Sequence, residues 1–471
     1  MTTFATDIQL VYVLAAACFV VGLHLMNSPA TARRGNQVST AGMVIAVAAT
    51  LVLLIHNGTV TAAGWIVLVL GALAGSAVGL WSARTVQMTA MPQLVSMFNA
   101  VGGGAAALVA VHDYIHAESL PGGVLGTTTV ATVLDVIIGS VTFSGSIIAA
   151  GKLQGLIPGQ PIIFRGGRAV NIALGVIIIG TAAFMFAAAS LPALLLLVLA
   201  SLAFGVMMVL PIGGADMPVV ISLLNAFTGT AVAMAGIVIN NWALIIAGAL
   251  VGASGGILTK LMADAMNRSL ANIIVGGFGT GDAAAVVAGP GGDAQVRSIA
   301  ADDAAIQLAY AAKVIIVPGY GLAAAQAQHA VAELAGILES RGIEVSYAIH
   351  PVAGRMPGHM NVLLAEANVP YPQLKEMEEI NPEFPRTDVA LVIGANDVTN
   401  PAARRAGTAI SGMPILDVDQ AKSIIVIKRS MGHGYAGIDN ELYADPKTSM
   451  YFADAKTALA DLTAAVKTLV G

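Results

Sequence analysis

The chain has 471 residues, of which 57% are hydrophobic and only 10% are charged, which is too apolar for a soluble protein of this length. The formal net charge is −5, and residues 271–471 hold fourteen Lys and Arg against twenty-one Asp and Glu. The acidic second part argues against nucleic acid as a partner, and the single cysteine, Cys18, excludes an internal disulfide.

Nine apolar segments are long enough to cross a membrane as helices, at roughly 20 residues each. They lie near residues 8–26, 38–56, 62–81, 92–111, 130–150, 169–189, 192–211, 217–238 and 242–262. Glycines recur inside them, as at Gly71, Gly75 and Gly79, and we interpret these runs as packing seams between helices. The sequence therefore predicts an α-helical polytopic membrane domain over residues 1–270.

The connections between these segments predict the orientation of the chain. Lys and Arg follow only odd-numbered segments, and they are Arg33, Arg34, Arg84, Lys152, Arg165, Arg168, Lys260 and Arg268. The positive-inside rule then places the N-terminus outside and the C-terminal part in the cytoplasm, as expected for a multi-pass protein of the cell (inner) membrane. The N-terminus has no basic region or cleavage site, so we expect no removable signal peptide.

Polar residues inside a membrane are costly, and we treat them as functional candidates. The four candidates are Asn99, Asp135, Asp216 and Asn225. Asn99 and Asn225 could instead form hydrogen bonds between helices, and Asp216 could cap the start of the eighth segment. There is no ion-filter motif such as TVGYG, and with one cysteine we predict no metal site.

Residues 271–304 are rich in Gly, Ala and Asp and predict a flexible linker. A strand, a glycine turn, a helix and a second strand follow: Val314–Val317, Gly319-x-Gly321-x-x-Ala324, Leu322 to about Ser340, and Glu344–His350. Small residues in such a turn let the backbone approach a phosphate at a helix N-terminus. The pattern favours dinucleotide binding, with a bare tight turn as the alternative.

Further apolar runs predict strands at Val389–Ile393, Ile415–Val418 and Ser423–Ile427, and a closing helix from about Asp454 to Leu469. Strands that alternate with helices predict an α/β doubly wound, Rossmann-like domain over residues 305–471. Ligands of such sheets bind at the carboxyl ends of the strands, where the glycines and polar residues of this domain gather.

The residues at these strand ends favour NADP(H) over NAD(H). No acid that could bind a ribose 2′-hydroxyl ends the second strand, and Arg355 follows it. Lys428, Arg429 and Ser430 suit a 2′-phosphate, although they could be a solvated strand end. The loop 432–437 could close over a nucleotide or be an ordinary loop. Asp397 could bind the nicotinamide part or cap a helix.

Several long stretches resemble the β subunit of proton-translocating nicotinamide nucleotide transhydrogenases. In the soluble part they are Pro318–Gln328, His350–Ala367, Val392–Asp397 with Asn400 and Pro401, Gly412–Pro414 and Lys428–Gly437. In the membrane part they are Gly213–Val220, Ala265–Ser269 and Gly276–Thr280. The likeness covers essentially the whole chain.

This resemblance implies an oxidoreductase in which hydride passes between NAD(H), held by a partner, and NADP(H), held here, coupled to proton movement across the membrane. Only one dinucleotide fingerprint is present, so the resemblance implies an α subunit that carries the NAD(H) domain and further membrane helices. We expect a dimer of this αβ assembly. A channel or transporter gated by a regulatory nucleotide-binding domain is the alternative, but it would leave the cations at the strand ends unexplained.

The resemblance also implies roles for individual residues. Arg355 would face the pyrophosphate, Lys428 and Arg429 would hold the 2′-phosphate, and Asp397 near the nicotinamide and Tyr435 in the lid are the catalytic candidates. The full set of implied cofactor-binding residues is Gly319, Tyr320, Gly321, Ala324, Val352, Ala353, Gly354, Arg355, Met356, Pro357, Gly394, Ala395, Asn396, Asp397, Val398, Gly412, Met413, Lys428, Arg429, Ser430, Met431, Gly432, His433, Gly434, Tyr435, Asp454 and Ala455.

For the proton path, the candidates are the costly polar residues inside the membrane segments, Asn99, Asp135, Asp216 and Asn225. Some members of the family carry a histidine where this chain has Asn99. Since asparagine does not titrate, we expect the titrating group to be Asp216 or a histidine of the partner subunit.

Overall fold

The computed structural model describes most of the chain. The described residues are 3–26, 29–58, 60–87, 90–118, 126–158, 161–162, 164–188, 190–213, 217–265, 296–355, 358–406, 408, 410–432, 434 and 436–470. The chain divides into two compact units, one made of Met1–Ile212 and Val220–Thr259 and the other of Gly213–Val219 and Lys260–Gly471.

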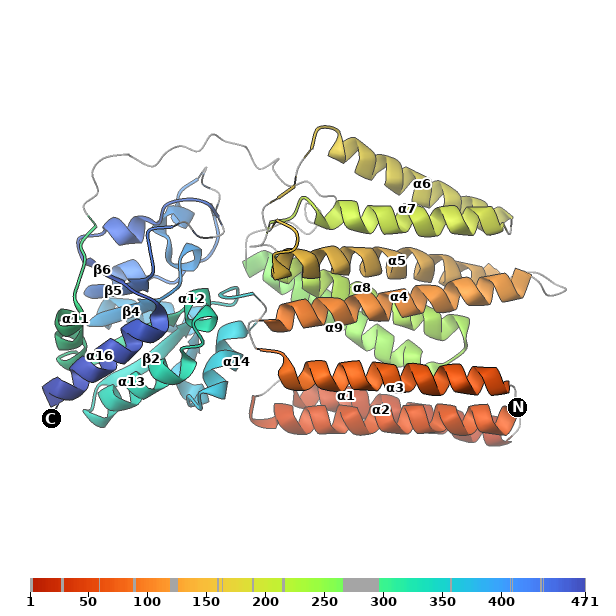
Figure 1. The fold of residues 1–471 in the computed structure, drawn as a ribbon, viewed down its shortest axis with the longest axis horizontal. Helices are drawn as coiled ribbons and strands as arrows, with labels where there is room; N and C mark the ends of the chain where they lie inside the picture. The colour runs from red at the N-terminus through yellow and green to blue at the C-terminus, as the bar shows by residue number, and fades with distance from the viewer. Residues whose placement is uncertain are drawn as a thin grey trace. The chain divides into compact units, whose positions relative to one another are not determined.

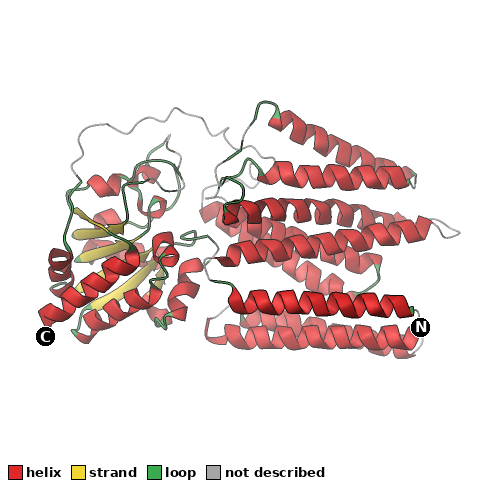
Figure 2. Cartoon of the chain, viewed as in Figure 1, coloured by secondary structure: helices red, strands yellow, loops and turns green. Residues whose placement is uncertain are grey.

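The first unit is helical (Figures 1 and 2). Its helices are α1 Thr3–Leu25, α2 Pro29–Asn57, α3 Ala62–Thr85, α4 Met91–Glu118, α5 Gly126–Gln154, α6 Gly167–Ala187, α7 Leu191–Val209, α8 Met217–Val238 and α9 Trp242–Ala265. Within the described part of the chain, these nine are long and apolar enough to cross a membrane, which confirms the nine predicted segments. Ser190 separates the sixth from the seventh, and its hydroxyl accepts a hydrogen bond from the Ala193 N–H at 3.4 Å.

Helix α5 has the largest buried share of these helices and packs against α4 and α7. Glycines make the contact with α4 close. A Cβ atom added at Gly139 would lie 2.5 Å from the Gly103 carbonyl oxygen, and one added at Gly103 would lie 2.8 Å from the Thr142 Cβ. Because side chains larger than hydrogen do not fit there, the α4–α5 seam depends on these glycines.

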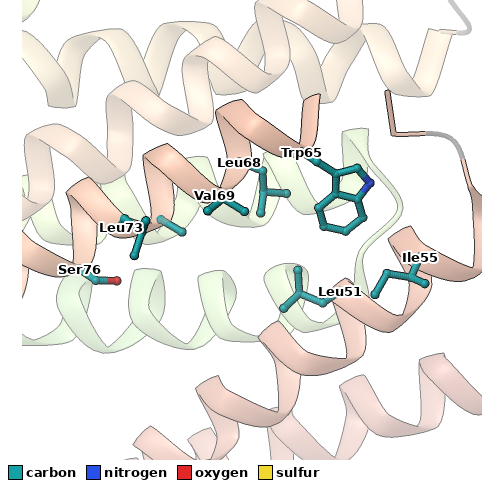
Figure 3. A pocket seen from close by; sticks show the side chains of 8 residues that line it. Leu51, Ile55, Trp65, Leu68, Val69, Leu73 and Ser76 are labelled. Atoms are coloured by element: carbon teal, nitrogen blue, oxygen red, sulfur yellow. The ribbon is translucent and has the colours of Figure 1, made fainter. Parts of the chain in front are cut away.

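Helix α3 differs, because none of its residues is buried. A Cβ atom at Gly71, Gly75 or Gly79 would meet nothing within 4 Å, so the predicted seam has no packing partner in the described part of the chain. Between α2 and α3 lies an apolar groove of about 410 Å³ (Figure 3). It is lined by Leu51, Ile55, Trp65, Leu68, Val69, Ala72, Leu73 and Ser76. With no charged side chain, it does not suit a nucleotide.

The second unit contains the predicted α/β domain. Its main elements are α11 Ala301–Ala309, β1 Lys313–Pro318, α12 Tyr320–Ala324, α13 Gln328–Ser340, β2 Glu344–Ile349, α14 His359–Glu366, β3 Leu374–Glu376, α15 Met377–Ile380, β4 Val389–Ile393, β5 Ser423–Lys428, β6 Thr448–Phe452 and α16 Ala455–Val470. Short 3-10 helices are η2 Tyr371–Gln373, η3 Asn381–Arg386, η4 Asp397–Thr399, η5 Pro401–Arg404, η6 Val418–Gln420 and η7 Glu441–Ala444.

The six strands form one sheet in the order β3-β2-β1-β4-β5-β6, and every neighbouring pair is parallel. Helices cover the sheet, with α16 packed against α11, α12 and α13 (Figure 2). The order runs outward from β1 to β3 on one side and from β4 to β6 on the other, as in doubly wound folds. The predicted fold class is therefore confirmed.

The sheet is apolar on both faces, as parallel sheets are. Alternate residues of the central strands, among them Ile315, Val392 and Val426, share one core cluster with Phe384 of η3. At the amino edge, the Asp388 Oδ2 atom accepts the N–H groups of Ala312 at 2.8 Å and of Lys313 at 3.1 Å. These bonds hold the start of β1 beside the start of β4.

Four local predictions differ from the structure. The helix expected from Leu322 to Ser340 is two helices, α12 and α13, because the chain turns at Gln326 with φ of 51°. Ile415–Val418 is buried but pairs with no described strand, since β4 lies directly beside β5. Strands β3 and β6 were not predicted. Within the expected linker 271–304, residues 271–295 lie outside the described residues, Ser298 bridges to Met450, and α11 begins at Ala301.

Candidate functional site

The candidate site lies where the strand order reverses, at the carboxyl ends of β1 and β4. The Gly319 N–H donates to the Ile393 carbonyl at 2.9 Å, and the Gly321 N–H donates to the Gly394 carbonyl at 3.0 Å. A Cβ atom at Gly321 would lie 2.6 Å from the Gly394 Cα, and Gly394 itself has φ of 63°. The glycines of the fingerprint thus bring two loops into backbone contact, at the position where doubly wound sheets bind ligands.

The loop after β2 places a cation over an aromatic ring beside this contact. The Arg355 guanidinium carbon lies 4.3 Å from the ring centroid of Tyr320, which α12 carries. The backbone N–H of Arg355 donates a hydrogen bond to Nδ1 of the buried His359 at 2.9 Å. Burial lowers the pKa of His359 to about 4, with a further contribution from the Arg355 charge. The imidazole is therefore neutral at pH 7 and can accept this bond.

The same loop is fixed by glycine and histidine. Gly354 has φ of 103°, and a Cβ atom there would lie 2.4 Å from the His359 Nδ1 atom. The Val352 N–H donates to His350 Nδ1 at 3.2 Å, while His350 Nε2 lies 2.9 Å from the Pro414 carbonyl oxygen. Ala353 is buried. Met356 and Pro357 lie outside the described residues.

The loop after β4 is bonded to the segment 434–440 (the lid segment). The Asp397 Oδ2 atom accepts the Ala436 N–H at 3.0 Å. The Asn440 side-chain amide donates to the Asn396 carbonyl at 2.9 Å, and that of Asn400 donates to the Asp439 carbonyl at 3.0 Å. Asn400 also accepts the Ala402 N–H at 3.1 Å, so it is Asn400 that caps the helix after Pro401. The alternative of Asp397 as that cap is not supported.

Lys428 ends β5, and its side chain bonds the backbone just before the lid segment. Its Nζ atom donates to the Gly432 carbonyl and lies 4.7 Å from the ring centroid of Tyr443. Burial lowers the pKa of Lys428, and the charges of Asp397 and Asp439 oppose this. Arg429, Ser430, Met431 and Gly432 are exposed, whereas His433 and Tyr435 lie outside the described residues. The solvent-facing polar groups of Arg429 and Ser430 therefore directly follow β5 at the carboxyl edge of the sheet.

The remaining candidates are more distant or structural. Gly412, with φ of 76°, donates its N–H to the Ala403 carbonyl at 2.8 Å, and Met413 and Ala436 both pack against the apolar cluster that includes Ala403. Asp454 accepts the Lys456 N–H at 3.1 Å and so caps α16, which follows the outermost strand. Ala324 is exposed, Ala455 is buried, and Ala395 and Val398 pack in the sheet core.

Three residues of this site were not predicted. The Tyr443 hydroxyl donates to Asn396 Oδ1 at 3.0 Å, and the Asn440 side-chain amide donates to the Asn396 backbone carbonyl. His359 Nδ1 accepts a hydrogen bond from the Arg355 backbone N–H. None directly follows a predicted strand, so no positional signal marked these residues. Of these, His359 alone lies inside a stretch that carries the resemblance.

In the membrane unit, two of the four polar candidates lie on facing helices. The Asn99 side-chain amide donates to the Ile221 carbonyl at 3.2 Å, and the Thr228 hydroxyl lies 3.3 Å from the Asn99 carbonyl oxygen. Asn225 stands between Ile221 and Thr228 at helical spacing and therefore lies on the α8 face toward α4. Asp135 is fully buried on α5, and Asp216 lies outside the described residues.

No group of three or more His, Cys, Asp or Glu side chains that could hold a metal ion is found among the residues described.

Comparison with known proteins agrees with the geometry. The family described as "NAD(P) transhydrogenase beta subunit" matches residues 8–465. Two relatives from Rhodospirillum rubrum, one of them from a defined strain, are both named NAD(P) transhydrogenase subunit beta. Each is 48% identical over 450 residues, which is 94% of this chain and 96% of the relative's length.

Proposed function

Because the chain belongs to the family of NAD(P) transhydrogenase beta subunits, we propose that its α/β domain holds NADP(H) and that its helices carry protons across the membrane. The family and the membrane helices make it a membrane-embedded subunit of an oxidoreductase, and the gated-channel alternative is not favoured. The name beta subunit implies an α subunit as partner.

The residues at the carboxyl edge of the sheet fit an NADP(H) molecule. The observation that carries this proposal is the cluster of cations around a glycine-lined switch point: Arg355 over Tyr320, Lys428 over Tyr443, and the exposed Arg429. Arg355 would neutralise the pyrophosphate, and Lys428 with Arg429 would bind the 2′-phosphate. Asp397, which is bonded to the lid segment, would link nucleotide binding to closure.

When bound, NADP(H) would supply the hydride chemistry, exchanging a hydride with NAD(H) held by the α subunit. The residues of this chain would bind and orient it, and the lid segment, including Tyr435, would exclude water. We propose Asn99, Asp135, Asp216 and Asn225 for the proton path. We also propose an inner-membrane location with the N-terminus outside and the nucleotide domain in the cytoplasm, and a dimer of the αβ assembly.

Calorimetry on the purified full chain tests the cofactor assignment. NADPH should bind far more tightly than NADH, and Arg429→Ala should weaken NADPH binding by about 1.5–3 kcal/mol, the usual cost of losing a charge-assisted hydrogen bond. NADH binding should change little. Arg341→Ala is the matched control, because Arg341 is also exposed but precedes β2 at the opposite edge of the sheet. Equal losses for both nucleotides would refute the role of Arg429.

A further inference from the structure

Asp135 is a carboxyl group inside the membrane unit whose hydrogen-bonding capacity is not used by the described residues. Its side chain is 0% exposed, and neither carboxyl oxygen has a hydrogen-bond partner in the described part of the chain. A buried ionised carboxylate without a partner is costly. An ionisable residue kept at such a position inside a membrane points to a function for its proton.

The side chain lies on the seam between α4 and α5. Gly139 follows it by one helical turn and Thr142 by two, and both pack against Gly103 of α4. Thr132 precedes Asp135 by one turn on the same face, and its hydroxyl also has no partner among the described residues. A hydroxyl with an unused donor and acceptor beside a carboxyl group is a short segment of a proton relay.

No cation in the described part of the helices around Asp135 is hydrogen-bonded to its carboxyl group. Helices α4, α5, α6 and α7 share one apolar cluster here. Their other titratable residues are His112, Asp113, Tyr114, His116, Lys152 and Arg168, and Glu118, whose side chain lies outside the described part. Lys152 is about 25 Å along α5 from Asp135, and it donates to the carbonyls of Leu210 and Ile212. The carboxyl group can therefore hold a proton without a fixed counter-ion.

Asp135 and the asparagine pair occupy different depths. Asp135 lies about 9 Å along α5 from the start of its apolar span at Thr129. Asn99 and Asn225 lie about 12 Å from the starts of α4 and α8, at the opposite end of the bundle, since α4 and α5 are antiparallel neighbours. Asp135 therefore lies nearer one end of the helical bundle, and the asparagine pair lies nearer the other end.

We propose that Asp135 is the proton-binding residue of the part of the path near the α4–α5 connection, and that Asn99 with Asn225 lines the other part. A carboxylate oxygen of Asp135 takes up one proton, forming an O–H bond, and passes that proton to the next acceptor, which regenerates the carboxylate. This inference rests on the proposed function and adds a titrating group that Asn99 cannot supply.

The test uses the complete enzyme, assembled with its α subunit, in proteoliposomes that report proton movement with a pH-sensitive dye. Asp135→Asn keeps the shape but cannot bind a proton, so proton movement and the hydride transfer coupled to it should fall at least tenfold. Asp135→Glu restores the carboxyl group and should retain at least a third of the wild-type rate. Ser201→Ala is the matched control, because its hydroxyl on α7 is also buried without a described partner. It should change neither rate.

Wild-type proton movement by an assembled Asp135→Asn enzyme overturns the inference and leaves the proposed function intact. Absence of hydride transfer in the wild-type assembly would instead refute the proposed function. If Asp135→Asn does not assemble, infrared spectroscopy of the wild type and Asp135→Glu tests the inference instead. A carboxylic C=O band that shifts between the wild type and Asp135→Glu, and that shrinks as the external pH rises, supports the inference. Identical bands in the two proteins overturn it.

Discussion

The two units of the chain both use glycine to bring backbones together, but the polar residues beside the two glycine contacts differ in their hydrogen bonding. At the sheet switch point, Gly321 meets Gly394, and in the membrane unit Gly103 meets Gly139. Around the first contact, Asn396 and Asp397 bond groups on the lid segment. Beside the second, Asp135 and Thr132 have no partner among the described residues.

The reason lies in the backbone. A helix satisfies its own N–H and C=O groups, so a polar side chain in the membrane unit must share a carbonyl that is already bonded, as Asn99 does at Ile221, or stay without a partner. A loop leaves its N–H and C=O groups open, and side chains such as Asn440 can bond them. The loops therefore fix polar side chains in place, which suits ligand binding, whereas Asp135 and Thr132 on α5 have no bond to a described residue that would compete for a proton.

The largest expected effect tests whether nucleotide binding is confined to the loops of the α/β domain, so that the chain has one nucleotide site. The purified chain alone should transfer no hydride from NADH to an NADP+ analogue above the rate without protein, because among the described residues the dinucleotide geometry is found in the α/β domain alone. Addition of the NAD(H)-binding α subunit should restore transfer, measured by absorbance of the reduced analogue. Full activity of the single chain would reveal a second site and break the comparison.

A smaller effect tests the glycine contact of the α/β domain. Gly321→Ala should destabilise the domain by about 1–3 kcal/mol, because the new methyl group would overlap backbone atoms of Gly394 that cannot move independently. NADPH affinity should fall with it. Gly336→Ala in α13 is the matched control, since a Cβ atom there meets nothing within 4 Å and alanine favours a helix. Thermal unfolding of the full chain, followed through the α/β domain, should rank the two variants in this order.

The smallest expected effect concerns pH. His359 has its pKa lowered to about 4, below its ordinary value of 6.5, so the unfolded loop binds a proton before the folded one does. The stability due to neutral His359 is complete above pH 6.5 and is lost as the pH falls toward 4. The loss should reach on the order of 2 kcal/mol by pH 4.5.

Hydrogen exchange of residues 350–366 at pH 5 and pH 7, corrected for intrinsic rates, measures this loss. His359→Gln should flatten the pH dependence, and the exposed His329→Gln should not. An unchanged pH dependence in His359→Gln would show that another group controls this loop.

The parts of the fold that the sequence predicts are those with strong local patterns. Apolar segments of membrane length predicted the nine helices, and strand β4 was predicted from five consecutive apolar residues, Val389–Ile393. The break at Gln326 lies in an alanine-rich stretch without proline or glycine, so nothing local marked it. Strand β3, with the sequence LKE, has neither the length nor the apolar content of a typical strand.

The site was predictable only in part, because much of it depends on contacts between distant residues. The glycine fingerprint and the cations at strand ends are local features, and the structure places Arg355 and Lys428 against aromatic rings at that edge. Asp397 meets Ala436 across 39 residues, and Asn99 meets Ile221 across 122. Such pairs form only when the tertiary fold brings them together, so neither local pattern nor residue spacing reveals them.

The central place of β1 also governs the order of events on the ribosome. Lys313 and Asp388, which open β1 and precede β4, are 75 residues apart. One edge of β1 can pair with β2 early, but its other edge stays uncovered until β4 has been synthesised, roughly 4–15 s later at about 5–20 residues per second. During that interval an apolar strand edge stays open in a chain whose membrane helices have already been synthesised. Nascent chains halted between β2 and β4 should therefore be the ones that cellular chaperones hold longest.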